Sequence, residues 1–247
     1  MRLQLGTSRL ENFPPKVLEI FLDETWTHLG DLEHDPLSLD RVSISYIVQV
    51  VKGKGIKFIL HKGLLKFLDL IDYKKLARRE DYNYTNFKEF YYQKGDRLPF
   101  DDNSLSYIFS EHFFEHLFFD EALSLLQECQ RILKPGGVIR TCVPDADLRA
   151  YAPPEPVGYP DVKLAWNHPS KHKTRWSVYN LTEALRVTGF HPLPLYYCDK
   201  SGQHICTDPV SEKQAYEQCV DPEMVFSLNY IIRMNSLIVD GIKKPTS

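Results

Sequence analysis

One short run of the sequence has residue types and spacing that could bind a metal ion or move a proton. It reads H-x-x-E-H and contains His112, Glu115 and His116. On a helix the two histidines would share one face, as two ligands of one metal ion must. Imidazole also has a pKa near neutrality, so His112 beside a bound substrate could remove its proton. A pattern with three fixed positions does not by itself decide between these chemistries.

A second set of residues could contact a nucleotide-like ligand. Gly6, Asp23, Gln93 and Ser110 each come where a predicted strand ends. In an open parallel sheet, ligands bind beyond the carboxyl ends of the strands. The sequence therefore predicts that these four residues lie near one ligand-binding edge.

Apolar runs that predict strands alternate with patterns that predict helices. These strands and helices must position both the H-x-x-E-H residues and the four strand-end residues. Strands are predicted at residues 3–5, 17–22, around Tyr91 and Tyr92, and at 105–109, 138–143, 190–198 and 236–242. This alternation favours an α/β fold with a doubly wound sheet.

Two helices have clear end signals. The first is predicted to be capped by Asp120 and to end at the Lys-Pro-Gly-Gly of residues 134–137. The second is predicted to open at Asn180 and to close at Gly189. The buried face of the first helix is expected to comprise Ala122, Leu125, Leu126, Cys129, Ile132 and Leu133.

Residues 97–145 carry the most specific pattern. They read RLPFDDNSLSYIFSEHFFEHL, then the predicted helix, then QRILKPGGVIRTCVPD. In this order the pieces resemble the second half of the core of class I S-adenosylmethionine-dependent methyltransferases of the type 11 kind. The resemblance implies a Rossmann-like, doubly wound, mostly parallel sheet whose last strand is antiparallel. It also implies a single domain over residues 1–247, with a basic amphipathic insertion around 52–79.

The same resemblance implies roles for the residues at the strand ends. S-adenosylmethionine would be the cofactor, with Gly6 and Thr7 approaching its methionine part. Asp23 would accept hydrogen bonds from the ribose hydroxyls. Gln93 and Lys94 would flank the adenine.

Residues after the fourth strand would complete the site. Ser110 would close the cofactor site, and Glu111 or His112 would face the substrate and remove its proton. The methyl acceptor is not identified, and a small molecule, a glycan or a lipid would each fit the resemblance.

Two other functions remain open. The stretch Leu5-Gly6-Thr7-Ser8 has one glycine where the family carries several, which suits a catalytically degenerate methyltransferase fold that acts as a binding module. A zinc-dependent hydrolase could use the H-x-x-E-H residues. Because these letters fall where the methyltransferase pattern places them, we expect no bound metal.

Charge and cysteine usage restrict the partners. The net charge of −3 gives no whole-chain argument for nucleic acid binding. The basic amphipathic residues 52–79 could contact an anionic membrane or a phosphate-bearing substrate, or form a solvated helix face. Five cysteines in irregular spacing suggest reduced thiols and a cytoplasmic location. Cys198, His204 and Cys206 lie on a predicted hairpin, which argues against a zinc site.

Overall fold

The computed structural model describes residues 1–6, 25–30, 86–148, 171–227 and 236–245. The predicted strand at 17–22, the basic segment 52–79 and the predicted loop at 152–168 lie outside these residues. Within the described ranges, every helix is too short or too polar to cross a membrane.

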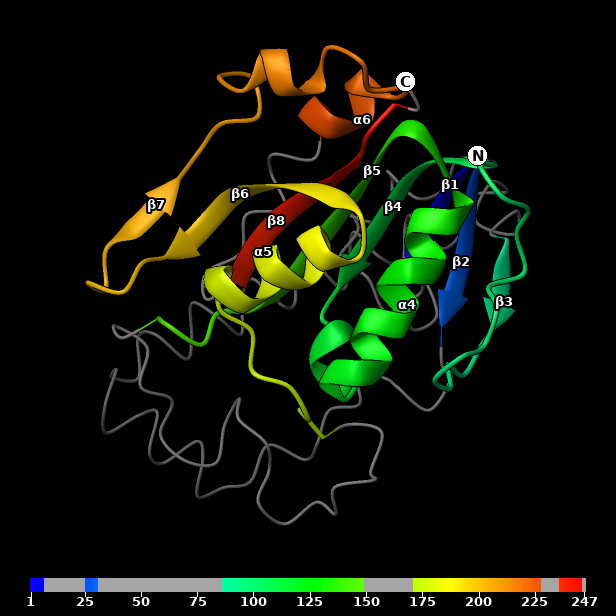
Figure 1. The fold of residues 1–247 in the computed structure, drawn as a ribbon, viewed down its shortest axis with the longest axis horizontal. Coiled ribbons are helices and arrows are strands. Elements are labelled where there is room, and N and C mark those ends of the chain that lie inside the picture. Colours follow the sequence, from blue (N-terminus) through cyan, green and yellow to red (C-terminus); the bar gives the residue numbers. More distant parts are fainter. Residues whose placement is uncertain (7–24, 31–85, 149–170, 228–235, 246–247) are drawn as a thin grey trace, which may run out of the picture.

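In the described ranges, eight strands form one twisted sheet in the order β3-β2-β1-β4-β5-β8-β6-β7 (Figure 1). Strands β1 to β5 pair in parallel, whereas β8 runs antiparallel to both of its neighbours, β5 and β6. The predicted α/β sheet, mostly parallel with an antiparallel last strand, is confirmed. The strands are β1 Arg2–Leu5, β2 Trp26–Gly30, β3 Phe87–Glu89, β4 Leu105–Glu111, β5 Leu133–Pro144, β6 Phe190–Cys198, β7 His204–Cys206 and β8 Ser236–Lys243.

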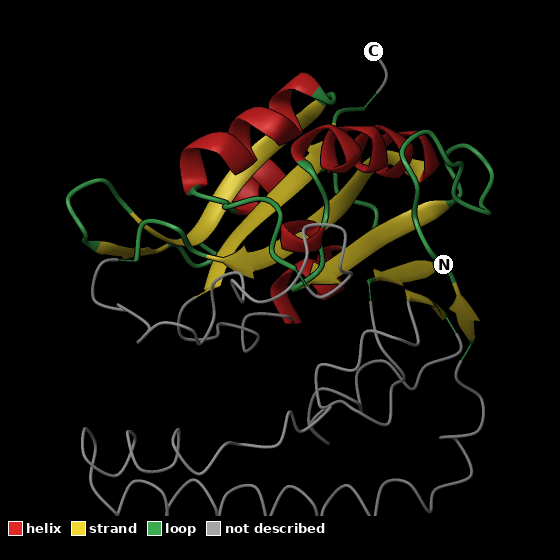
Figure 2. Ribbon diagram, turned by 90° about the horizontal axis from the view of Figure 1, so that it is seen from below, coloured by secondary structure: helices red, strands yellow, loops and turns green. Residues whose placement is uncertain are grey.

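Helices cover both faces of this sheet. Helices α4 (Phe119–Ile132) and α5 (Val178–Val187) lie side by side over one face, as Figure 2 shows. The short helices η4 (Lys213–Tyr216) and α6 (Pro222–Ser227) pack on the other face. A further short helix, η3 (Phe114–His116), follows β4 at the carboxyl edge.

The apolar face predicted for the first helix is confirmed, but its cap is not Asp120. Five of the six predicted positions are buried on α4, and the sixth, Leu133, is buried at the start of β5. The N-cap is Phe118, whose backbone N–H donates to the Glu121 carboxylate. Asp120 lies in the first turn instead, where a carboxylate complements the helix dipole.

Several predicted boundaries are wrong by a few residues. The third strand is Phe87–Glu89, so Tyr91 and Tyr92 follow it. Strand β5 begins at Leu133, so the Lys-Pro-Gly-Gly run belongs to the strand. Helix α5 has Ser177 as its N-cap, and the Asn180 side chain accepts from the Ser177 N–H. Gly189 does close this helix, with a φ of 95° that suits glycine.

A buried ion pair ties the antiparallel strand to the parallel part of the sheet. Arg140 on β5 and Asp240 on β8 are register partners, and the guanidinium donates two hydrogen bonds to the carboxylate, at 2.8 and 2.7 Å. Both residues are almost fully buried. Burial by itself lowers the pKa of Arg140, but the Asp240 carboxylate outweighs it and holds the pKa above its usual range. Tyr216 donates to Asp240, and Arg140 donates to the carbonyl of Val225.

Removing one member of this pair should destabilise the protein strongly. Asp240→Leu or Arg140→Met leaves a buried charge without its partner, and we expect each to lower the free energy of unfolding by about 3–5 kcal/mol. The double variant Arg140→Met/Asp240→Leu should recover most of this loss. Urea unfolding measures the three values. Glu183→Gln, in the exposed pair with Arg186 on α5, is the control and should change little. A double variant as unstable as either single one would contradict this account.

Candidate active site at the carboxyl ends of the strands

The parallel register brings the ends of β1, β2 and β4 to one edge. Leu5 is the register partner of both Leu29 on β2 and Ser110 on β4. Gly6 therefore follows β1 beside the point where Glu111 ends β4. Gly6 and Ser110, predicted for the cofactor, therefore lie at the same edge as Glu111 and His112, predicted for proton transfer.

Gly6 turns the chain sharply after β1. Its φ is 79°, a left-handed conformation that glycine adopts without strain. A Cβ placed on Gly6 would lie 2.1 Å from the Phe113 side chain. Phe113 comes from the loop after β4, so an aromatic ring of that loop packs directly on the first-strand turn.

The strand that pairs with β1 in the described residues is not the one predicted just before Asp23. The strand beside β1 is Trp26–Gly30, so Asp23 precedes this strand and does not follow it. Asp23 and Thr7 themselves lie outside the described residues. In the sequence, the acidic residue directly after β2 is Asp31, which also falls in an undescribed range.

Gln93 and Lys94 lie in a turn that is fastened to α4. The Gln93 N–H donates to the Asp96 carboxylate at 2.9 Å. Lys94 forms a 2.7 Å ion pair with Asp120, which raises the pKa of the lysine. Both residues follow β3.

Ser110 is completely buried within β4. Its hydroxyl has no hydrogen-bond partner among the described residues, and neither has that of Thr141, its register partner on β5. The side chain faces the same side of the sheet as Leu5. Ser110 thus contributes to packing beneath the edge in this structure.

His112 is held by a buried carboxylate. Its φ is 51°, it follows the last residue of β4, and its side chain is 41% exposed. His112 Nδ1 lies 3.1 Å from Glu115 Oε1. A carboxylate in this position orients an imidazole and stabilises its protonated form, which is what a general base requires.

The electrostatics of Glu115 favour its ionised form. Burial by itself raises the pKa of this carboxyl, yet the hydrogen bond from His112 and the nearby His112, His116 and His172 together lower it. Sequence reasoning gave Glu115 a role only as part of a metal motif. The spacing of three residues between His112 and Glu115 was a signal in the sequence that could have indicated their contact. The left-handed turn at His112, which makes this contact possible, had no such signal.

The helix assumed for the H-x-x-E-H residues does not form. The short helix η3 spans only Phe114–His116, and His112 lies before it. His112 and His116 therefore do not share a helix face, and the structural premise of the hydrolase hypothesis is wrong. Cys198 and His204 are paired across the β6–β7 hairpin, as predicted.

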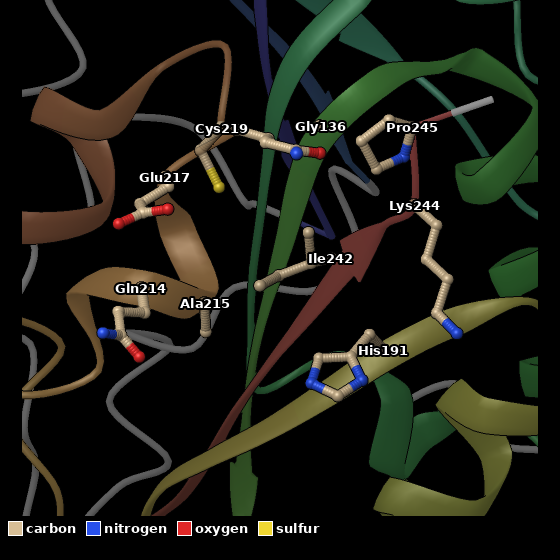
Figure 3. Close-up of a pocket in the computed structure, with 10 residues that line it drawn as sticks. Gly136, His191, Gln214, Ala215, Glu217, Cys219, Ile242, Lys244 and Pro245 are labelled. Carbon is tan, nitrogen blue, oxygen red and sulfur yellow. The ribbon is translucent and has the colours of Figure 1, made fainter. Parts of the chain in front are cut away.

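The pocket in Figure 3 lies at the opposite end of the sheet. Its volume is about 390 Å³, and it is lined by η4, the segment after it and the C-terminal end of β8. Ile242 in its wall pairs with Val138, near the amino end of the parallel part of β5. It is therefore separate from the candidate active site.

Comparisons with known proteins agree with the predicted resemblance. The family model of the methyltransferase domain matches residues 64–141, which include β3, β4, α4 and most of β5. The match starts within the basic segment. It confirms the resemblance to the methyltransferase domain family and supports S-adenosylmethionine as the cofactor. A comparison with curated protein sequences gave no match.

Solved methyltransferase structures are similar over nearly the whole chain. One from Aquifex aeolicus is 14% identical, with a TM-score of 0.42, and covers 98% of this chain and 80% of its own. One from Archaeoglobus fulgidus is 15% identical, with a TM-score of 0.44, and the match covers 98% of this chain and 85% of that protein. An O-methyltransferase family protein from Burkholderia thailandensis is 9% identical, with a TM-score of 0.49, and the match covers 100% of this chain and 51% of that protein.

The contact between Gly6 and Phe113 can be tested by substitution. Gly6→Ala should lower the free energy of unfolding by more than about 1 kcal/mol, because it adds left-handed strain to a steric clash. Adding Phe113→Ala should remove the clash and leave the strain, so the double variant should lose less than the two single effects combined. Thermal unfolding measures all three. Gly95→Ala is the matched control, since it has a φ of 91° but an open surrounding. Equal losses for Gly6→Ala and Gly95→Ala would show that Phe113 does not constrain Gly6.

Proposed function

With residues 64–141 matched to the methyltransferase domain family, we propose that this chain transfers a methyl group from S-adenosylmethionine to a small-molecule, glycan or lipid acceptor. The observation that carries the proposal is the convergence of Gly6 and the Glu115-held His112 at the carboxyl edge of this sheet. The described residues fit a cofactor there, because Gly6 turns the backbone without a side chain and three parallel strands end side by side.

Each residue of the edge has a task in this proposal. Gly6 and Thr7 would hold the methionine part of the cofactor. An acidic residue after β2 would accept hydrogen bonds from the ribose hydroxyls. S-adenosylmethionine supplies an electrophilic methyl group when bound. The chain's main contribution is to align the acceptor for in-line displacement.

His112 is proposed as the general base for a hydroxyl acceptor. Glu115 keeps the imidazole oriented and favours its protonated form, so His112 can take the proton as the acceptor oxygen attacks. Glu111 ends β4 one residue earlier and is a second candidate for this task.

One observation favours a second function. Phe113 occupies the space beside Gly6, and the first-strand turn has a single glycine. A methyltransferase fold that binds a ligand without turnover would fit this crowding. Cofactor binding without methyl transfer to any acceptor would favour that function.

Cofactor binding should depend on Asp31 rather than Asp23. We expect S-adenosylmethionine and S-adenosylhomocysteine to bind with free energies of about 5–8 kcal/mol. Asp31→Ala should weaken binding by about 1–3 kcal/mol, because a hydrogen bond to a charged group is lost. Asp23→Ala is the control and should bind as wild type. Titration calorimetry decides the matter, and an absence of heat at millimolar cofactor would refute the proposed catalysis.

Loss of His112 should separate chemistry from cofactor binding. In His112→Ala, methyl transfer to a hydroxyl acceptor should fall by about 10²–10⁴-fold, the usual contribution of a general base. The cofactor affinity should stay within twofold. A screen of hydroxyl, amine and thiol compounds, followed by release of S-adenosylhomocysteine, supplies the acceptor and the rate. His191→Ala, at an exposed histidine of β6, is the control. Unchanged turnover in His112→Ala would exclude the base role.

A further inference from the structure

A cluster of possible metal ligands lies beside the His112–Glu115 pair. Glu115, His116 and His172 each present a ligand atom, and these atoms all lie within 4.8 Å of one another. The two imidazole rings meet edge to face, with their centroids 4.8 Å apart. This set differs from the H-x-x-E-H pattern, because His172 replaces His112 and comes from a distant part of the chain.

Glu115 has one oxygen engaged and one available. The residue is 2% exposed. Oε1 contacts His112, whereas Oε2 is buried and has no hydrogen-bond partner in the described part of the chain. A buried carboxylate oxygen without a partner costs free energy, so a partner at this position would stabilise the fold.

Backbone contacts fix His172 against Glu115. The N–H groups of Lys173 and Thr174 donate to the Glu115 carbonyl, at 2.7 and 3.2 Å. The Thr174 hydroxyl donates to the Leu117 carbonyl at 2.8 Å. The segment that contains Glu115 and the segment that contains His172 are thus joined before any ligand binds. This lowers the entropic cost of ordering a binding site.

The donor set suits a divalent transition metal. Two imidazoles and one carboxylate match zinc sites that have three protein ligands and keep an open position. Ligand atoms about 2.0–2.2 Å from zinc stand roughly 3.5 Å apart, so small side-chain rotations would close the present cluster. His116 and His172 are partly exposed, which leaves a path for the ion.

We propose that Glu115, His116 and His172 form a binding site for a divalent transition metal ion, with zinc as the reference ion. His112 acts as a positioning residue that holds the other oxygen of Glu115. The site stands on these three residues and does not depend on methyl transfer. It replaces the expectation from the sequence that no metal binds.

The test is titration of metal-free full-length protein with zinc chloride in the absence of cofactor. Calorimetry should show one zinc per chain, and the melting temperature should rise on binding. Glu115→Gln and His172→Ala should each weaken zinc binding at least tenfold, and His112→Ala by about 10–100-fold. Circular dichroism verifies that each variant is folded. His172→Ala, at a partly exposed residue, keeps the test valid if Glu115→Gln does not fold.

Controls separate this site from other zinc ligands on the surface. His191→Ala removes an exposed histidine, and Cys206→Ser removes an exposed thiol. Both should bind zinc as wild type, and cobalt substituted for zinc should show no thiolate-to-metal charge-transfer band. Absent zinc binding, equal binding in His172→Ala, or loss of binding in Cys206→Ser would each overturn the proposal. None of these results bears on cofactor binding, which is measured separately.

Discussion

The buried contact between Arg140 and Asp240 fixes how the two parts of the sheet join. It sets the register of the antiparallel strand β8 on β5, and the same carboxylate receives the hydroxyl of Tyr216. Two buried charges are tolerated there only because each has several partners. By holding β5 in place, this contact also fixes β4, whose end carries Glu111 and His112. The geometry of the edge thus depends on an interaction two register positions before the end of β4.

A single carboxylate connects the proposed base to the proposed metal site. One oxygen of Glu115 lies on His112, and the other is available to a cation beside His116 and His172. A bound cation would draw electron density from the carboxylate and so weaken its support of His112 as a base. The same cation could polarise an acceptor oxygen directly. The two chemistries would therefore share one residue and alter each other's strength.

The sequence predicts most of the fold because its signals there are local. The apolar face of α4, the closing Gly189 and the strand 190–198 all follow from spacing and turn residues. The strand β2 was missed because its interior includes a polar pair, in which His28 contacts Gln4 on the neighbouring strand at 2.7 Å. That choice of partner is non-local, so spacing along the sequence did not indicate that β2 lies beside β1. His172 was equally hidden, since the hydrogen bond that brings its segment to Leu117 spans 57 residues. A base role for His112 stays a prediction, whereas its left-handed turn and its link to Glu115 were found only in the structure.

The strand order also affects how the chain can be made. Ser106 at the start of β4 bonds to the carbonyl of Met1, 105 residues away, and Arg140 bonds to Asp240 across 100 residues. At about 5–20 residues per second, a ribosome needs roughly 5–20 s to supply β4 after β1 has been made. During that interval the apolar Leu3 and Leu5 lack the strand that buries one side of them. Contacts of such long sequence separation slow folding and leave strand edges open to other chains. A central strand that precedes its main neighbour by so much makes this fold one for which chaperone binding during synthesis would matter.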